Sequence, residues 1–203
     1  FNSLKTRSLF QYQVQKAKLV DVARQLFAKM GVENTTMNDI ALASKKGRRT
    51  LYTYFKSKED IYMAVVESEL DMLSDMMKRV AEKNISPDEK MIEMIYTRLD
   101  AVKEVVFRNG TLRANFFRDI WRVEKVRKRF DAKEILLFKD VLREGVEKGV
   151  FRIDDIDMTA ELVHYCVKGI EVPYIRGHIG AKLDDETRDK YVVNLVFGAL
   201  HRT

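Results

Sequence analysis

Residues 35–60 read TTMNDIALASKKGRRTLYTYFKSKED, and this stretch decides the fold. Thr36 can cap a helix that starts at residue 37, because its hydroxyl oxygen accepts hydrogen bonds from the free amides of the first turn. Asp39 then places a carboxylate near the positive end of that helix. We expect the helix to run to about Ser44 and to be followed by a short polar break, residues 45–47. The pattern predicts a short helix and an abrupt turn.

A second short helix follows the break, over residues 48–55. Leu51 and Phe55 are four residues apart and therefore share the face that packs inward. The other positions face outward and carry side chains with hydrogen-bond donors: Arg48, Arg49, Thr50, Tyr52 and Tyr54. The two tyrosines could instead pack in the core, because aromatic rings are often buried there.

Amphipathic helices are expected on both sides of this pair. The segment 15–30 keeps apolar residues at helical spacing, and Gly31 can end it in a left-handed conformation. Ser57 and Asp60 form a start like a capping box, and the helical period then continues to about Lys83. Three short helices that lead into a long one are typical of a compact DNA-binding head and its connector.

The rest of the chain also has helical periodicity, which agrees with only two prolines in 203 residues. We therefore predict an all-α protein: a three-helix head with a helix-turn-helix over residues 1–60, and a helical bundle over residues 61–203. The further predicted helices are 88–108 (with Ser86 as cap and Pro87 in the first turn), 111–121, 124–148, 160–175 (capped by Asp157 or Thr159 and ended or kinked by Pro173) and 185–201. The helix 124–148 is expected to bury Phe130, Ile135, Leu136, Phe138, Val141, Leu142 and Val146.

The excess positive charge lies entirely in the predicted head. Residues 1–60 hold 12 Lys and Arg against 5 Asp and Glu, a balance of 12 − 5 = +7, whereas residues 61–203 hold 25 against 26, a balance of −1. A basic end beside a neutral remainder is typical of a phosphate-binding module attached to another domain. A merely solvated surface is the alternative that charge alone leaves open.

Several classes of protein are disfavoured. No stretch approaches the roughly 18 apolar residues of a membrane span. The start FNSLKTRSLF lacks both a Met and the apolar core of a signal peptide, so we expect a trimmed or partly ordered N-terminus and a cytoplasmic protein. The single Cys166 excludes an intrachain disulfide framework. Glu161 and His164 have the spacing of a carboxylate-bundle metal motif but lack a second copy, so a packed histidine is the better interpretation. No phosphate-binding loop or nucleophile motif is present, and we expect neither an enzyme nor a cofactor.

The stretch 35–60 and its flanks resemble the N-terminal helix-turn-helix of the tetracycline-repressor (TetR) family of transcription regulators. The resemblance covers residues 17 to about 66, with a first helix ending in Phe27-Ala-x-x-Gly31, then Thr35-Thr36-Met37-x-Asp39-Ile40-Ala41, then Thr50-Leu51-Tyr52-x-Tyr54-Phe55-Lys56-Ser57-Lys58-Glu59. The rest of the chain is similar to family members only in length and helical character. The resemblance implies a DNA-binding regulator without enzymatic activity.

The predicted DNA contacts follow from this resemblance and from side-chain chemistry. Arginine can donate two hydrogen bonds to guanine or pair with phosphate, threonine can meet a thymine methyl, and a helix N-terminus is a natural phosphate site. The predicted contact residues are Thr35, Thr36, Lys45, Lys46, Gly47, Arg48, Arg49, Thr50, Tyr52, Thr53, Tyr54 and Lys58.

The turn departs from the family pattern. Members usually have Ala-Gly-Val-Ser, whereas this chain has Ser44-Lys45-Lys46-Gly47. Either the turn has another geometry, with its glycine shifted by two places, or the lysine stems lie over apolar surface and hold their ammonium groups near phosphates. We favour the second alternative.

The resemblance also implies that the bundle over residues 61–203 is an effector-binding and dimerisation domain, with a small-molecule site among the middle helices and a homodimer formed by the last two helices. An aromatic and Met-rich lining indicates an apolar or aromatic effector, although the same residues can be plain core; polar groups such as Glu171 or His164 would orient the ligand. The predicted lining is Met94, Phe107, Phe116, Phe117, Trp121, Phe138 and Tyr165. The last two helices are apolar around much of their surface, which indicates burial either in the core or against a partner subunit. The predicted interface is Val163, Val167, Ile170, Val192, Val193, Val196 and Leu200.

A protein of another class is the alternative: a helical small-molecule carrier whose basic head meets nucleic acid only non-specifically. The two hypotheses differ in DNA specificity, because a regulator prefers its own site to random DNA by orders of magnitude.

Overall fold

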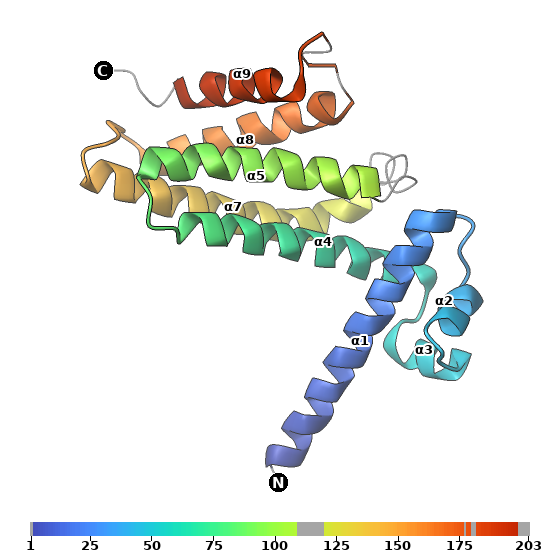
Figure 1. Cartoon of the computed structure of the whole chain (residues 1–203). Helices are drawn as coiled ribbons and strands as arrows, with labels where there is room; N and C mark the ends of the chain where they lie inside the picture. Colours follow the sequence, from blue (N-terminus) through green and yellow to red (C-terminus); the bar gives the residue numbers. More distant parts are fainter. Residues whose placement is uncertain (1, 109–119, 177, 180–181, 199–203) are drawn as a thin grey trace. The chain divides into compact units, whose positions relative to one another are not determined.

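The computed structural model describes residues 2–108, 120–176, 178–179 and 182–198, and over these ranges the chain is helical and has no strands. The helices run in the order α1 (Asn2–Met30), α2 (Met37–Ala43), α3 (Arg48–Tyr54), α4 (Lys58–Ala81), α5 (Pro87–Arg108), α7 (Ile120–Glu147), α8 (Ile156–Ile175) and α9 (Asp185–Gly198) (Figure 1). The all-α prediction is confirmed. In the described part of the chain, no helix is both long and apolar enough to cross a lipid bilayer.

The chain divides into two compact units. Unit 1 comprises residues 1–69 and 106–124, and unit 2 comprises residues 70–105 and 125–203. Helix α4 begins in unit 1 and continues into unit 2, so the connector predicted from the sequence is one continuous helix.

Unit 1 is built around α1, α2, α3 and the start of α4. Apolar side chains at helical spacing on α1 pack against α2, and α2 packs against α3. Gly31 ends the packed part of α1 with φ 86°, a conformation that only glycine adopts without strain, and its amide donates to the Phe27 carbonyl. The core is Leu19, Val20, Ala23, Phe27, Ile40, Ala41, Leu51, Phe55, Ile61, Tyr62, Val65 and Val66, each less than 9% exposed.

Helix α1 is much longer than the sequence pattern predicts. The expected start was residue 15, whereas the helix begins at Asn2. Residues 6–13 are all exposed, so they contribute no apolar stripe from which helical periodicity could be recognised.

Unit 2 is a bundle in which α5, α7, α8 and the second half of α4 run side by side, with α9 against α8 (Figure 1). Its core is Leu73, Met77, Val80, Met91, Met94, Ile95, Leu99, Ala101, Val102, Phe130, Phe138, Val141, Leu142, Phe151, Ala160, Val163, Val167 and Tyr174.

Two local predictions in unit 2 are wrong. Leu136 is 59% exposed, because α7 turns Glu134 and Phe138 inward and position 136, two residues from each, lies on the other side of the helix. Helix α8 is capped by Asp155, whose carboxylate accepts from the Met158 amide at 2.9 Å, and not by Asp157 or Thr159.

The helix predicted over 111–121 falls mostly outside the described residues. Its last two positions, Ile120 and Trp121, belong to the start of α7. The predicted end of the final helix, beyond Gly198, also lies outside the described residues.

Candidate nucleic-acid interface

Helix α3 is anchored by one buried face and presents the rest of its surface outward. Leu51 is 0% exposed and Phe55, just after the helix, is 3% exposed. The remaining side chains of the helix are exposed, except Tyr54, which is half-buried; the exposed set is Arg48, Arg49, Thr50, Tyr52 and Thr53. A short helix held by two apolar anchors is a rigid platform for outward donors.

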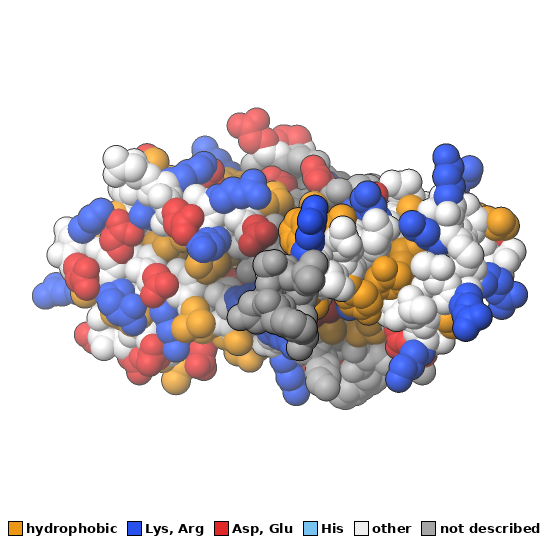
Figure 2. Space-filling model, turned by 90° about the horizontal axis from the view of Figure 1, so that it is seen from below, with side chains coloured by type: hydrophobic (Ala, Val, Ile, Leu, Met, Phe, Trp, Pro, Cys, Tyr) orange, Lys and Arg blue, Asp and Glu red, His pale blue; other side chains and the backbone are white. Residues whose placement is uncertain are grey.

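The two arginines at the start of α3 have no anionic partner within the described residues. Their guanidinium groups take part in none of the hydrogen bonds or ion pairs formed there, and both side chains are exposed. Figure 2 shows the wider setting: the surface over α2 and α3 carries mostly basic side chains among uncharged ones, whereas basic and acidic side chains alternate over unit 2. Arg48 and Arg49 are therefore free to donate to an external anion or to base edges.

The turn between α2 and α3 has a lysine, and not a glycine, at its left-handed position. Lys45 has φ 54° and its amide donates to the Leu42 carbonyl, while the Lys46 amide donates to the Ala41 carbonyl, both at 3.0 Å. This pair of bonds is the Schellman end of a helix, with its left-handed residue at Lys45. Gly47 has φ −66° and serves as the N-cap of α3, so the glycine is not shifted into the strained position.

The lysine at this left-handed position costs free energy, about 1–2 kcal/mol relative to a right-handed conformation. Lys45 and Lys46 are both exposed and line an open groove together with Lys18, Leu19 and Val22 of α1. Their stems thus border apolar atoms while their ammonium groups remain accessible, as the favoured alternative for the turn requires.

The N-terminus of α2 has the Thr36 cap that the sequence predicts, and Asp39 completes it into a capping box. The Asp39 amide donates to the Thr36 hydroxyl at 3.2 Å, and the Thr36 amide donates to the Asp39 carboxylate at 2.8 Å. The hydrogen bonds from the side chain and the backbone of Thr36 lower the pKa of Asp39 below its ordinary value. Thr36 is therefore exposed, but its amide and its hydroxyl are already hydrogen-bonded to Asp39.

Two predicted DNA contacts are structural residues instead. Thr35 is 0% exposed and its hydroxyl donates to the Gly31 carbonyl at 2.7 Å. The Lys58 ammonium donates to the Val32 carbonyl at 2.7 Å and to the Glu33 carbonyl at 3.2 Å. The Thr35 hydroxyl closes the loop between α1 and α2 on itself, four residues back along the chain, whereas Lys58 ties that loop to the start of α4. The Lys58 contact joins residues 26 apart and cannot be read from local sequence.

The two tyrosines of α3 differ in their surroundings. Tyr52 is 43% exposed, whereas the ring of Tyr54 stacks on Tyr12 of α1 with centroids 4.7 Å apart. Tyr12 was not among the predicted site residues, because the helix that carries it was not predicted to extend so far. Thr53 donates its hydroxyl to the Thr50 carbonyl at 2.7 Å, which fixes its methyl group on the exposed face of the helix.

Unit 2 has a second concentration of charge, and it is buried. The Arg98 guanidinium lies between Glu134, at 2.6 Å, and Glu171, at 3.2 Å, and Arg127 donates to Glu171 at 3.0 Å. Burial alone would lower the pKa of Arg98, but the neighbouring carboxylates of Glu134, Glu171 and Asp131 together raise it above its ordinary value. Arg98 is therefore a permanent cation in the core.

His164 belongs to the same buried network. It is 0% exposed, and its Nδ1 lies 2.7 Å from the Glu134 carboxylate, while its Nε2 lies 3.7 Å from Asp131. Asp131, Glu134 and His164 come close enough to hold a cation, but their carboxylates already pair with Arg98 and Lys168. These two cations beside the cluster oppose binding of a further positive ion. Glu161, the other half of the predicted motif, is exposed.

The predicted effector residues fall into three groups. Met94 and Phe138 are both 0% exposed within unit 2. Tyr165 is 59% exposed and so is not part of an interior lining, because it lies on the face of α8 opposite the core. The side chains of Phe107, Phe116, Phe117 and Trp121 lie outside the described residues.

The predicted dimer residues on α8 need a correction. Val163 and Val167 are 4% and 1% exposed in the single chain, so they are core residues of unit 2. Ile170 is half-buried, and the side chains of Val192, Val193, Val196 and Leu200 lie outside the described residues. The exposed apolar side chains lie elsewhere on these two helices: Met158, Leu162 and Tyr165 on α8, and Tyr191 and Leu195 on α9, each at least 55% exposed.

Comparison with known proteins agrees with this geometry. Residues 19–65 match the family model for bacterial regulatory proteins of the tetR family. The HTH-type transcriptional repressor KstR2 of Mycolicibacterium smegmatis is 27% identical over 155 residues, which cover 73% of this chain and 74% of that protein.

Solved structures share the fold over nearly the whole chain. A transcriptional regulator from Cytophaga hutchinsonii has a TM-score of 0.72 at 22% identity and covers 91% of this chain and 97% of its own. The transcriptional regulator FadR from Bacillus subtilis, solved in complex with stearoyl-CoA, has a TM-score of 0.65 at 15% identity and covers 91% of this chain and 99% of its own. The matched segment, residues 19–65, contains the whole described interface from Lys45 to Thr53.

Proposed function

The chain belongs to the tetR family of bacterial helix-turn-helix transcription regulators, and from that premise we propose that it is a ligand-responsive repressor that binds a palindromic operator as a homodimer. A DNA-binding regulator of transcription, with no enzymatic activity, is what membership of the family itself implies. The operator, the dimer and the effector are the steps proposed here.

The observation that carries the proposal is the exposed cation set of α3 and its turn, which has no anionic partner among the residues that the structure describes. Arg48 and Arg49 lie at the start of a helix that is held inward by Leu51, and Lys45 and Lys46 flank them on the turn. In this arrangement the arginines read base edges in the major groove and the lysines contact phosphates. Tyr52 and Thr53, on the same exposed surface, extend the contact to the backbone.

The exposed stripe of α8 and α9 supports a dimer. Met158, Leu162 and Tyr165 follow one face of α8 at helical spacing, and Tyr191 and Leu195 do so on α9. Large apolar side chains gathered on one face of a soluble unit mark an interaction site. Two copies of this pair of helices would form a four-helix interface, and two-fold symmetry would place two recognition helices one turn of DNA apart, about 34 Å.

The effector is proposed to be an apolar or aromatic small molecule bound in unit 2. The interior supplies apolar surface at Met94 and Phe138, and buried polar groups at His164 and Glu171 that can orient a ligand. That a protein of the same fold was solved with stearoyl-CoA supports a bound organic ligand in this kind of bundle. Binding would favour a state of the dimer with the wrong spacing between its two heads, so that DNA is released by a shift of populations.

Selection of bound duplexes from a random pool tests the proposal. The selected site should bind at least a thousandfold more tightly than a scrambled duplex at the same salt concentration, as measured by fluorescence anisotropy. Tyr54→Phe keeps the ring that stacks on Tyr12 and removes only the hydroxyl, which is a proposed contact to the DNA backbone. The variant should therefore weaken the selected complex without changing the mass of the dimer. Parity between selected and scrambled DNA would favour the alternative, a helical small-molecule carrier with only non-specific affinity for nucleic acid.

The dimer has its own test. Leu162→Asp and Leu195→Asp place charges in the proposed interface and should halve the mass measured by light scattering, whereas Leu136→Asp, at an exposed apolar position of α7, should not. A mass that none of the three substitutions changes would contradict the proposed interface.

A further inference from the structure

The N-terminal part of α1 lies outside the region that the family model covers. The match to the family model begins at residue 19, whereas helix α1 begins at Asn2. This preceding segment, residues 2–18, is called the arm below. It carries Lys5, Arg7, Lys16 and Lys18, and the chain has no acidic residue before Asp21.

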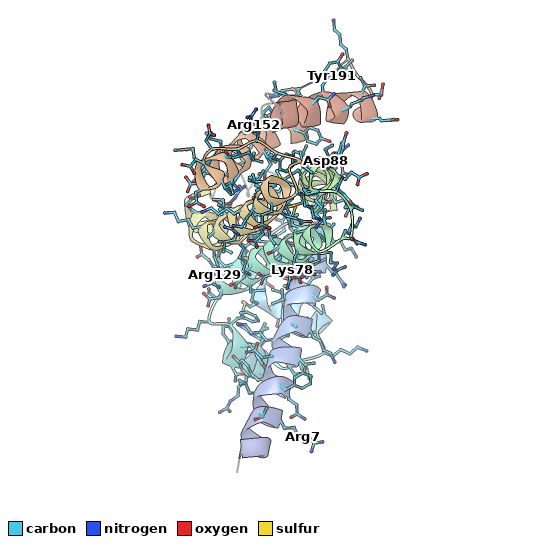
Figure 3. All side chains as sticks on the ribbon, turned by 90° about the vertical axis from the view of Figure 1, so that its left-hand side faces the viewer. Arg7, Lys78, Asp88, Arg129, Arg152 and Tyr191 are labelled. Atoms are coloured by element: carbon cyan, nitrogen blue, oxygen red, sulfur yellow. The ribbon has the colours of Figure 1, made fainter. Side chains whose placement is uncertain are left out.

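The arm is largely uncovered within unit 1. Residues 6–13 are all exposed, including Leu9 at 61% and Phe10 at 68%. Figure 3 shows Arg7 near the N-terminal end of α1, directed away from the helix. A helical segment that buries so little is stabilised poorly by its own domain and gains most from a partner.

Two contacts tie the arm to the end of the recognition helix. The ring of Tyr12 stacks on Tyr54 at 4.7 Å, and the Lys16 ammonium lies 5.6 Å from the ring centroid of Phe55. Further along α1, Lys18 borders the groove that Lys45 and Lys46 also line. The cations of the arm therefore continue the basic surface of α3 and its turn.

The reach of the arm follows from helix geometry. At 1.5 Å per residue, position 5 lies about 10 Å beyond Tyr12 along the axis and position 2 about 15 Å beyond it. Phosphates on one strand of DNA are about 3.4 Å apart, so the arm can span roughly three or four of them past the end of α3.

We propose that the arm is an additional DNA-binding element, which contacts backbone phosphates that flank the site read by α3. The proposal rests on the proposed function, because α3 must first dock on DNA for the arm to reach those phosphates. A segment with four cations and no anion is complementary to a polyanion, and it adjoins the surface already assigned to DNA. A second copy of the chain fits less well, because two arms side by side would bring like charges together.

The test compares two double variants on two duplexes. Lys5→Gln/Arg7→Gln removes two charges from the arm, and the matched control Lys128→Gln/Arg152→Gln removes one lysine and one arginine from exposed positions of unit 2. Each protein is titrated by anisotropy at several salt concentrations, against the selected site alone and against the same site with six extra base pairs on each side.

The arm variant should bind the flanked duplex on the order of tenfold more weakly than the wild-type protein, with a slope of log affinity against log salt lower by roughly two to four. On the trimmed duplex the two proteins should bind alike, and the control should match the wild-type protein on both. An unchanged slope and affinity on the flanked duplex would overturn the inference, as would an equal loss on both duplexes.

The same titrations separate this inference from the proposed function. If the wild-type protein prefers its selected site but the arm variant loses nothing, only the role of the arm is overturned. If the wild-type protein shows no preference for any selected site, the proposed function fails together with the inference that rests on it. An arm variant that changes the mass of the protein in solution without changing DNA affinity would assign the arm to a second copy and overturn the inference.

Discussion

Each unit of the molecule has a cluster of cations, and the surroundings of the two clusters are opposite. In unit 1, Lys45, Lys46, Arg48 and Arg49 are exposed and have no anionic partner in the described part of the chain. In unit 2, Arg98, Arg127 and Lys168 lie against three buried carboxylates. A cation neutralised inside its own domain is not available to a ligand outside it, whereas an uncompensated surface cation is available to an external anion. The position of the cations, more than their number, distinguishes the DNA-binding unit 1 from the helical bundle of unit 2.

The largest expected effect comes from breaking the buried network. Glu134→Gln removes the carboxylate shared by Arg98 and His164, both of which are nearly fully buried. An uncompensated charge in the core should lower the free energy of unfolding by about 3–5 kcal/mol, measured by urea denaturation. Asp140→Asn is the control, because Asp140 is exposed on the same helix, and it should change stability by less than about 0.5 kcal/mol. Equal effects of the two substitutions would mean that the network is solvated.

A smaller effect is expected when an exposed cation of the head is removed. Lys46→Gln should weaken selected and scrambled duplexes by a similar factor, on the order of tenfold in a dimer, and lower the salt slope by about one per subunit. The stability of the protein should not change, because the Lys46 side chain is exposed. Anisotropy at three salt concentrations measures both quantities. A loss confined to the selected duplex would show that Lys46 reads bases and not phosphates.

The turn offers a substitution that should improve stability and impair binding. Lys45 has φ 54°, and glycine adopts this conformation without strain. Lys45→Gly should therefore raise the free energy of unfolding by about 0.5–1 kcal/mol, while the lost ammonium weakens DNA binding. Thermal denaturation and anisotropy give the two values. Lys46→Gly is the matched control: it removes the same charge at a position without positive φ and should destabilise the head. A Lys45→Gly protein that is less stable than the wild type would refute the idea of strain at this position.

The smallest effect concerns the capping box of α2. Hydrogen bonds from Thr36 lower the pKa of Asp39 below its ordinary value of 3.8. The Asp39 carboxylate therefore stabilises the folded state above that value and loses this contribution as the pH falls through its lower folded-state pKa. The difference in stability between the wild-type protein and Asp39→Asn should shrink between pH 7 and pH 3, as followed by thermal denaturation. A difference that stays constant with pH would exclude the carboxylate as its source.

Local signals in the sequence were sufficient for the helix ends of the head. The Thr36–Asp39 and Ser57–Asp60 caps depend on side chains within four residues of the backbone groups that they satisfy. The Gly31 terminus depends on the backbone freedom of glycine and on its own amide, which donates to the Phe27 carbonyl four residues back. The prediction of two short helices around a turn succeeded for that reason.

Contacts between distant residues could not be predicted in the same way. Lys58 has the chemistry of a DNA contact, and only the fold shows that the Val32 carbonyl, 26 residues away, already engages it. The Thr35 hydroxyl bonds only four residues back, but the burial that removes it from the surface is also a property of the fold. Glu134 is buried where hydrophobic patterning expects solvent, because its partners come from α5 and α8. Patterning assigned Leu136 to the core because its side chain is apolar, whereas the fold leaves it exposed and buries Glu134 instead. The extension of α1 carries no apolar periodicity at all, and so it went unpredicted.

The most direct test of the central claim is the specificity of a protein that lacks the two arginines of α3. The affinities of the wild-type protein and Arg48→Ala/Arg49→Ala for the selected site and for a scrambled duplex should be measured at one salt concentration, with Lys128→Gln/Arg152→Gln as the control. Each lost contact to a base edge costs about 1–3 kcal/mol of discrimination, so the variant should lose at least a hundredfold in the ratio of the two affinities and keep its fold and mass. A ratio equal to that of the wild-type protein would show that another surface reads the DNA.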